Sequence, residues 1–199
     1  VYVMMKLCGY APENINIDIV PLFETMEGLD RSLEVMQTLY HHTVYQKHLA
    51  KRNNKQVIML GFSDGTKDGG YLKANWQIYT AKEKLTKLSE ENGIKVVFFD
   101  GRGGPPARGG GKTHDFYASQ GNTIANNQIE LTIQGQTITS VFGNKDQAKF
   151  NFEQLLTAGV ENDVFKSVKK DLNEKERSLI SELADISYKK YSDLKAHPM

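Results

Sequence analysis

Three short apolar runs of the sequence each end in a carboxylate, and a stretch with helical periodicity follows the first two. The runs and their carboxylates are residues 16–23 with Glu24, residues 56–63 with Asp64, and residues 96–99 with Asp100. Successive carboxylates are 40 and 36 residues apart, close to the period of a strand followed by a long helix. Such units predict parallel strands, because right-handed crossovers return each strand in the same direction. We therefore expect an α/β fold in which the carboxyl ends of three strands share one edge.

The stretch after the first run has the spacing of an amphipathic helix. Apolar residues recur every three or four positions from Leu29 to Val44, which predicts one long helix after the first carboxylate. His41, His42 and His48 fall in this stretch without Glu or Cys partners at metal-binding spacing, so we expect them to face solvent.

A second long helix is predicted after Gly70. Its apolar residues continue to Leu88, and residues 92–93 (Asn-Gly) supply a C-terminal stop. The segment between the second apolar run and Gly70 is rich in glycine and predicts a loop.

The last third of the chain changes character. Residues 129–142 alternate around a Gln-Gly-Gln turn at 134–136 and predict a hairpin or a bent strand pair. From about Asp146 the chain is predicted to be helical to its end, with a capping box at Asn173 and Glu176.

The third apolar run leads directly into a glycine-rich loop, residues 101–111, that contains Arg102 and Arg108. Glycines let the backbone approach a ligand closely, so the two arginines can converge on an anion. A phosphate or carboxylate site is predicted. Other interpretations stay open. Residues 111–113 copy the end of a Walker A loop, although Pro106 replaces its first glycine. Arg-Gly-Gly triplets also occur in RNA-binding segments, and a structural glycine turn is a third alternative.

The shared strand edge would bring together charged residues that are far apart in the sequence. They are Glu24, Asp64, Lys67, Arg102 and Arg108. The carboxyl edge of a barrel is where catalytic residues are assembled, and two carboxylates there favour a metal site. Simpler interpretations remain: Glu24 can serve a helix N-terminus, Asp64 can form an Asx turn, and Lys67 can be solvated.

The composition excludes several functional classes. Twenty-five Lys and Arg residues face 24 Asp and Glu residues, so neither a nucleic-acid nor a membrane-surface partner is expected. No stretch approaches about 18 apolar residues and no signal peptide opens the chain. The single cysteine, Cys8, fits a reducing compartment. We expect a cytoplasmic protein.

Several motifs, in this order and spacing, resemble the phosphoenolpyruvate carboxylase family. They are residues 21–25 (PLFET), residues 61–70 (GFSDGTKDGG), Trp76, residues 99–111 with the start FDGRGG, and residues 134–136 (QGQ). The resemblance covers about Ile15 to Gly143. Any one motif would be weak, but their combination is specific.

The resemblance implies a partial TIM-type (β/α) barrel with long helices, belonging to a larger, mostly helical enzyme. Residues 1–143 would form three βα units and the hairpin, and residues 144–199 a helical extension, without an independent second domain. A whole barrel needs about 250 residues. The family's upstream histidine motif and arginine-bearing C-terminal half are not found in this sequence, so we expect a fragment that is inactive alone.

The resemblance also implies a reaction and a role for each site residue. The family adds bicarbonate to phosphoenolpyruvate and releases oxaloacetate and phosphate, with Mg²⁺ or Mn²⁺. Glu24 and Asp64 correspond to the metal ligands, and Lys67 to an active-site lysine near bicarbonate. Arg102 corresponds to the arginine on the substrate phosphate, and Arg108 to the loop arginine implicated in carboxylation.

The same resemblance implies partners beyond the substrates. In family members inhibited by aspartate, the inhibitor holds the arginine that corresponds to Arg108. The full-length family forms homotetramers, and the isolated fragment is expected to be able to self-associate through exposed strand edges.

Two departures from the family pattern bear on activity. Asp100 occupies a position that is usually histidine, and residues 105–107 (Pro-Pro-Ala) stiffen the loop. We expect Asp100 to lie in a partly solvated pair with Arg102 and partly neutralise it, and Arg102 to pack against no apolar surface. A non-catalytic or divergent anion-binding relative is therefore the alternative function.

Overall fold

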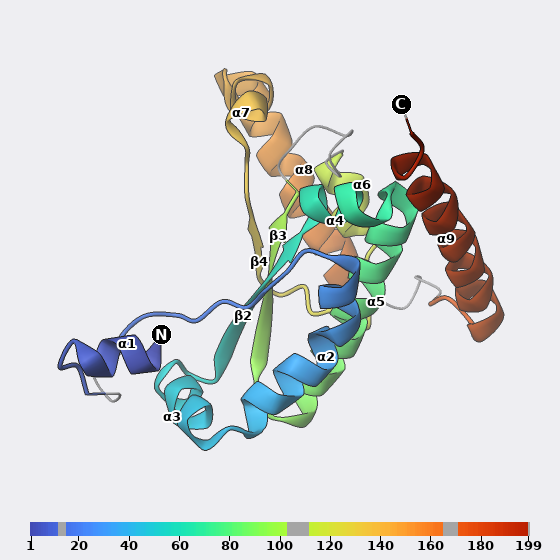
Figure 1. Ribbon diagram of the computed structural model, residues 1–199. Helices are drawn as coiled ribbons and strands as arrows, with labels where there is room; N and C mark the ends of the chain where they lie inside the picture. The colour runs from blue at the N-terminus through green and yellow to red at the C-terminus, as the bar shows by residue number, and fades with distance from the viewer. Residues whose placement is uncertain (12–14, 103–111, 165–170, 199) are drawn as a thin grey trace.

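The computed structural model describes residues 1–11, 15–102, 112–164 and 171–198 (Figure 1). Its centre is a four-stranded sheet in the order β1-β2-β3-β4, in which every neighbouring pair is parallel. The strands are β1 (Leu22–Phe23), β2 (Lys55–Gly61), β3 (Lys95–Gly101) and β4 (Ile129–Leu131). The predicted α/β fold with parallel strands is confirmed.

The strand register brings the three predicted carboxyl ends to one edge. Phe23 pairs with Leu60, Leu60 with Asp100, and Asp100 with Leu131. The middle strands are buried on both faces, which explains their continuous apolar runs. The outer strands β1 and β4 are not paired with each other, so the described residues do not show a closed barrel.

Helices α2 (Met26–His41) and α5 (Tyr71–Glu91) lie side by side and cover the sheet (Figure 1). The prediction for α5 is confirmed, including the stop, where Gly93 has a positive φ of 66°. Met36 of α2 and Leu85 of α5 are fully buried in the core between these elements. The Thr25 side chain caps α2 by accepting a hydrogen bond from the backbone N–H of Gly28.

The prediction of one long helix after Thr25 is wrong. The chain leaves the helical conformation at His42 and starts a second helix, α3 (Thr43–Lys51). The turn lets Tyr45 reach the start of β2, where its hydroxyl donates to Oε1 of Gln56 over 2.6 Å. His48 is buried rather than solvent-facing, with its ring 5.8 Å from the rings of both Tyr2 and Tyr45. Tertiary packing at the base of the sheet therefore overrides the helical periodicity.

The predicted hairpin over residues 129–142 is also wrong. The first half is β4, which pairs in parallel with β3, and the second half is a helix, α7 (Gly135–Phe142). This helix packs on α8 (Lys145–Val164), where the rings of Phe142 and Phe152 lie 5.2 Å apart. Asn151 of α8 also donates a hydrogen bond to the carbonyl of Val141. Alternation alone did not separate a strand pair from a short helix with an apolar partner.

The remaining helices are α1 (Tyr2–Leu7), α4 (Phe62–Gly69), α6 (Thr113–Ala118) and α9 (Glu174–Lys195). The predicted helical end of the chain divides into α8 and α9, and the capping box of Asn173 and Glu176 at the start of α9 is confirmed. Helix α9 packs along α5 (Figure 1). Among the described helices, none is both long and apolar enough to cross a lipid bilayer.

Candidate active site

The carboxyl edge of the sheet carries the predicted site residues that the structure describes. Glu24 follows β1 directly and lies against Gly61, the last residue of β2. A Cβ atom on Gly61 would overlap the Glu24 side chain, so glycine is needed here for close approach. The structure therefore places Glu24 and α4, which carries Asp64, at the same edge.

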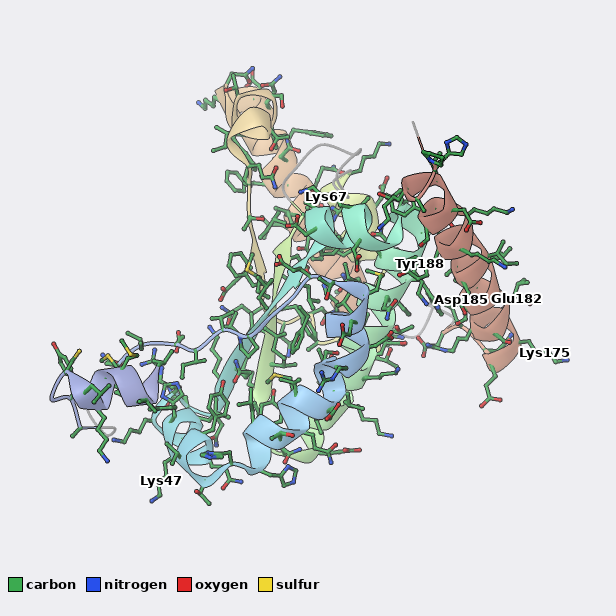
Figure 2. All side chains as sticks on the ribbon, in the orientation of Figure 1. Lys47, Lys67, Lys175, Glu182, Asp185 and Tyr188 are labelled. Carbon is green, nitrogen blue, oxygen red and sulfur yellow. The ribbon has the colours of Figure 1, made fainter. Side chains whose placement is uncertain are left out.

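Asp64 and Lys67 lie on α4, a helix where the sequence predicted a loop. Lys67 Nζ is 2.8 Å from Asp64 Oδ1, and both side chains are more than half exposed. Figure 2 shows Lys67 on this helix, at the end of the sheet where the strands finish. The helix forms despite two internal glycines because Gly65 and Gly69 pack closely on the segment around Met26.

Two neighbouring elements fix α4 in place. The Asp68 carboxylate accepts a hydrogen bond from the backbone N–H of Met26 over 2.8 Å, which ties α4 to the start of α2. From α9, the Tyr191 hydroxyl donates to the carbonyl of Lys67 over 2.9 Å. Lys195 donates to the carbonyl of Asp68 over 2.8 Å and so caps the C-terminus of α4. Sequence reasoning did not identify these α9 contacts.

The two carboxylates fit a divalent ion of the Mg²⁺ type, although they do not complete its shell. In the described part of the chain, no group of three or more His, Cys, Asp or Glu side chains could hold a metal ion. Mg²⁺ commonly uses only one or two protein carboxylates and takes its other oxygens from water and substrate phosphate. Glu24 and Asp64, neither of them buried, match that pattern.

Arg102, the first residue after β3, is buried, with 6% of its surface exposed. Its guanidinium carbon lies 4.0 Å from the centroid of the Phe116 ring and 5.7 Å from that of Phe62. Such cation–π contacts stabilise a desolvated guanidinium. The prediction that Arg102 packs against no apolar surface is therefore wrong.

Two buried donors of Arg102, Nε and Nη1, have no acceptor among the described residues. Burial lowers the pKa of Arg102, while Tyr117 and Asp100 act in the opposite direction. Unsatisfied buried donors are destabilising, by about 1–3 kcal/mol each and more when charged. An oxyanion in front of this side chain would accept from the guanidinium in the fork geometry that arginine favours.

Asp100 has a different environment from the one that the sequence suggested. Its carboxylate is fully buried, and Oδ2 accepts from Lys82 Nζ at 2.8 Å and from the Tyr117 hydroxyl at 2.9 Å. The expectation of a partly solvated pair with Arg102 is therefore wrong. Burial lowers the pKa of Lys82, Asp100 opposes that shift, and burial raises the pKa of Tyr117.

The family model for phosphoenolpyruvate carboxylase matches residues 1–198, almost the whole chain. The chain belongs to the phosphoenolpyruvate carboxylase family. The match extends past the motif-bearing region and includes α8 and α9, so the helical end is part of the family match as well. Membership supports a function related to that of phosphoenolpyruvate carboxylases.

Within this family frame, the structure brings together Glu24, Asp64, Lys67 and Arg102 at the carboxyl edge. Arg108 and the stiffening residues 105–107 lie outside the described residues, so their predicted roles stay predictions. Lys82 was missed by sequence reasoning. Its signal was its place in the apolar stripe of α5, four residues after Ile78 and three before Leu85, where a lysine is out of pattern.

Proposed function

We propose that this chain forms part of the active site of a phosphoenolpyruvate carboxylase, which adds bicarbonate to phosphoenolpyruvate to give oxaloacetate and phosphate. The observation that carries the proposal is the buried Arg102 guanidinium with two unsatisfied donors, next to an edge that presents Glu24 and Asp64. This combination suits a phosphorylated substrate held together with a divalent cation. Family membership supports the same assignment.

In this proposal, Glu24 and Asp64 hold Mg²⁺ or Mn²⁺, which supplies positive charge to the phosphate and enolate oxygens of the substrate. Arg102 binds the phosphate group and stabilises the charge that develops when it is transferred. Lys67, exposed and within reach of Asp64, is placed to bind bicarbonate. Arg108 is proposed to act during carboxylation and to be the contact for an aspartate-type inhibitor.

The proposed chemistry proceeds in two steps. A bicarbonate oxygen attacks the phosphorus of phosphoenolpyruvate, the bond from phosphorus to the enol oxygen breaks, and carboxyphosphate and the enolate of pyruvate are formed. Carboxyphosphate then releases CO₂ and phosphate, and the enolate carbon attacks CO₂ to give oxaloacetate. The apolar rings around Arg102 favour this reaction, because a site that excludes water protects the enolate from protonation.

The barrel is also part of the proposal. Four parallel strands in sequential order, with helices between them, are what a segment of a (β/α) barrel would look like. We further propose that the 199 residues act within a longer homotetrameric enzyme and are inactive alone.

The alternative function, a non-catalytic anion-binding relative, rests on Asp100 and the two loop prolines. It would use Arg102 but would not need Glu24 or Asp64. Replacement of either carboxylate by its amide should then leave anion binding unchanged, whereas the enzyme proposal expects divalent-ion dependence to be lost.

The test is oxaloacetate formation by the complete enzyme with Arg102→Met and Arg102→Lys. We expect a loss of about 10²-fold or more in turnover for the first variant, with poor rescue by lysine, because lysine cannot present two parallel donors. Arg52→Met is the matched control, because this arginine pairs with Asp18 at the opposite end of β2. Full turnover by both Arg102 variants would overturn the proposal.

A further inference from the structure

A charged cluster is buried between helix and sheet beside the candidate site. Lys82 comes from α5, Asp100 from the end of β3 and Tyr117 from α6. The Lys82 and Asp100 side chains are 2% and 0% exposed. One carboxylate oxygen, Oδ2, accepts from both Lys82 and Tyr117, whereas Oδ1 has no hydrogen-bond partner among the described residues.

The cluster is continuous with Arg102. Phe98, Asp100 and Arg102 alternate along the end of β3 and are all buried, so they share the face that α5 and α6 cover. The ring of Phe116 links the two cations, because Lys82 Nζ lies 5.2 Å and the Arg102 guanidinium carbon 4.0 Å from its centroid.

The hydrogen bonds divide these charges unequally. Asp100 is the nearest carboxylate to Arg102 along the chain, yet it is bonded to Lys82 and Tyr117 while Nε and Nη1 of Arg102 have no described acceptor. Two cations and one carboxylate leave a net charge of +1. If Lys82 were neutral, the buried carboxylate would lack its counter-ion, and Arg102 would be the closest replacement.

We propose that Lys82 and Tyr117 are positioning residues for Arg102: by holding the Asp100 carboxylate, they keep the Arg102 guanidinium available for an oxyanion. The identity of that oxyanion, the phosphate group of phosphoenolpyruvate, rests on the proposed function. The positioning does not, because it concerns which cation Asp100 binds. Aspartate at the position where the family has histidine is then compatible with an anion site, since Lys82 neutralises it.

The first test is the crystal structure of the complete protein with Lys82→Met, without ligand. We expect the Asp100 carboxylate to turn and bind Arg102. In the double variant Lys82→Met/Asp100→Asn, Arg102 should keep its original position, because the net charge of +1 is restored. Lys84→Met, an exposed lysine of the same helix, is the matched control and should change nothing. An Asp100 carboxylate that stays in place in the Lys82→Met structure would overturn the proposal.

If Lys82→Met does not fold, Tyr117→Phe gives a second route to the same answer. It removes one of the two bonds to Asp100 Oδ2 and leaves the ion pair. We expect the carboxylate to shift towards Arg102 by a smaller amount. An unchanged carboxylate in this variant would equally count against a positioning role for Tyr117 and Lys82.

The second test measures affinity, with inorganic phosphate and phosphoenolpyruvate as probes. Lys82→Met should weaken both by about tenfold or more, as expected when a charge-assisted hydrogen bond is lost. The double variant should recover affinity. A lysine that only braces the fold would lower the melting temperature in both variants, and affinity would not return in the double variant. If the wild-type protein binds neither probe, the proposed function fails, while the crystal structures still decide the positioning.

Discussion

The two halves of the carboxyl edge hold their charges in opposite environments. At the end of β3, Asp100 is fully buried with Lys82, and Arg102 is packed on Phe116. On α4, the Asp64 and Lys67 side chains are 54% and 60% exposed. Buried charges need fixed partners, because their desolvation is costly, whereas exposed charges exchange partners with water and ligands at little cost. We infer that the β3 half is preorganised and that the α4 half adapts when ligands bind.

The largest effect should come from the buried half. Lys82→Met leaves the Asp100 carboxylate without its counter-ion, and we expect the free energy of unfolding to fall by about 3–5 kcal/mol. Urea denaturation measures this. The control Lys84→Met should stay within about 0.5 kcal/mol. A loss below about 1 kcal/mol for Lys82→Met would remove the distinction between the two halves.

Close packing between β1 and β2 gives the next effect. In Gly61→Ala, the new Cβ would overlap Glu24, so we expect a loss of about 1–3 kcal/mol in stability and a displaced Glu24. Gly159→Ala is the matched control. A Cβ there meets nothing within 4 Å, and we expect a gain of about 0.5–1 kcal/mol in helix α8. Equal effects of the two substitutions would show that Glu24 is not held by Gly61.

The exposed half should affect stability least. Lys67→Met removes a solvent-exposed ion pair with Asp64, so we expect a stability change of at most about 1 kcal/mol. The apparent Michaelis constant for bicarbonate should nevertheless rise in the complete enzyme. A large loss of stability with unchanged kinetics would assign Lys67 to the fold rather than to the site.

His48, at the base of the sheet, should produce a small pH dependence. Burial lowers the pKa of His48 below its ordinary value of 6.5, Arg52 adds to this and Asp18 opposes it. The unfolded chain then binds more protons than the folded one between the two pKa values, so stability falls as pH is lowered through that window. Denaturation of wild type and His48→Gln between pH 7 and pH 5 measures it. The same slope in both proteins would contradict a buried neutral His48.

Apolar patterning predicted the parts of the fold that depend on local sequence. The parallel strands, helix α5 and the capping box of α9 all follow from periodicity and end signals. The break at His42 and the helix α7 were missed because each depends on a distant partner. Tyr45 binds Gln56 of β2, and Phe142 packs on Phe152 of α8. Residue spacing does not report such contacts.

The candidate site shows the same division. The shared edge of Glu24 and Asp64 could be predicted, because it follows from parallel strands. The burial of Arg102 and the pairing of Asp100 with Lys82 could not, because they depend on where α5 and α6 cross the end of β3. A lysine inside an apolar stripe is the one sequence signal that points to a buried counter-charge.

The most direct test of the central claim is a crystal structure of the complete enzyme with Mn²⁺ and phosphoenolpyruvate. We predict anomalous scattering from a manganese ion bound by Glu24 and Asp64, with phosphate oxygens accepting hydrogen bonds from Nε and Nη1 of Arg102. Phosphoenolpyruvate bound elsewhere, with Arg102 still packed on Phe116 and no manganese at the two carboxylates, would contradict the account.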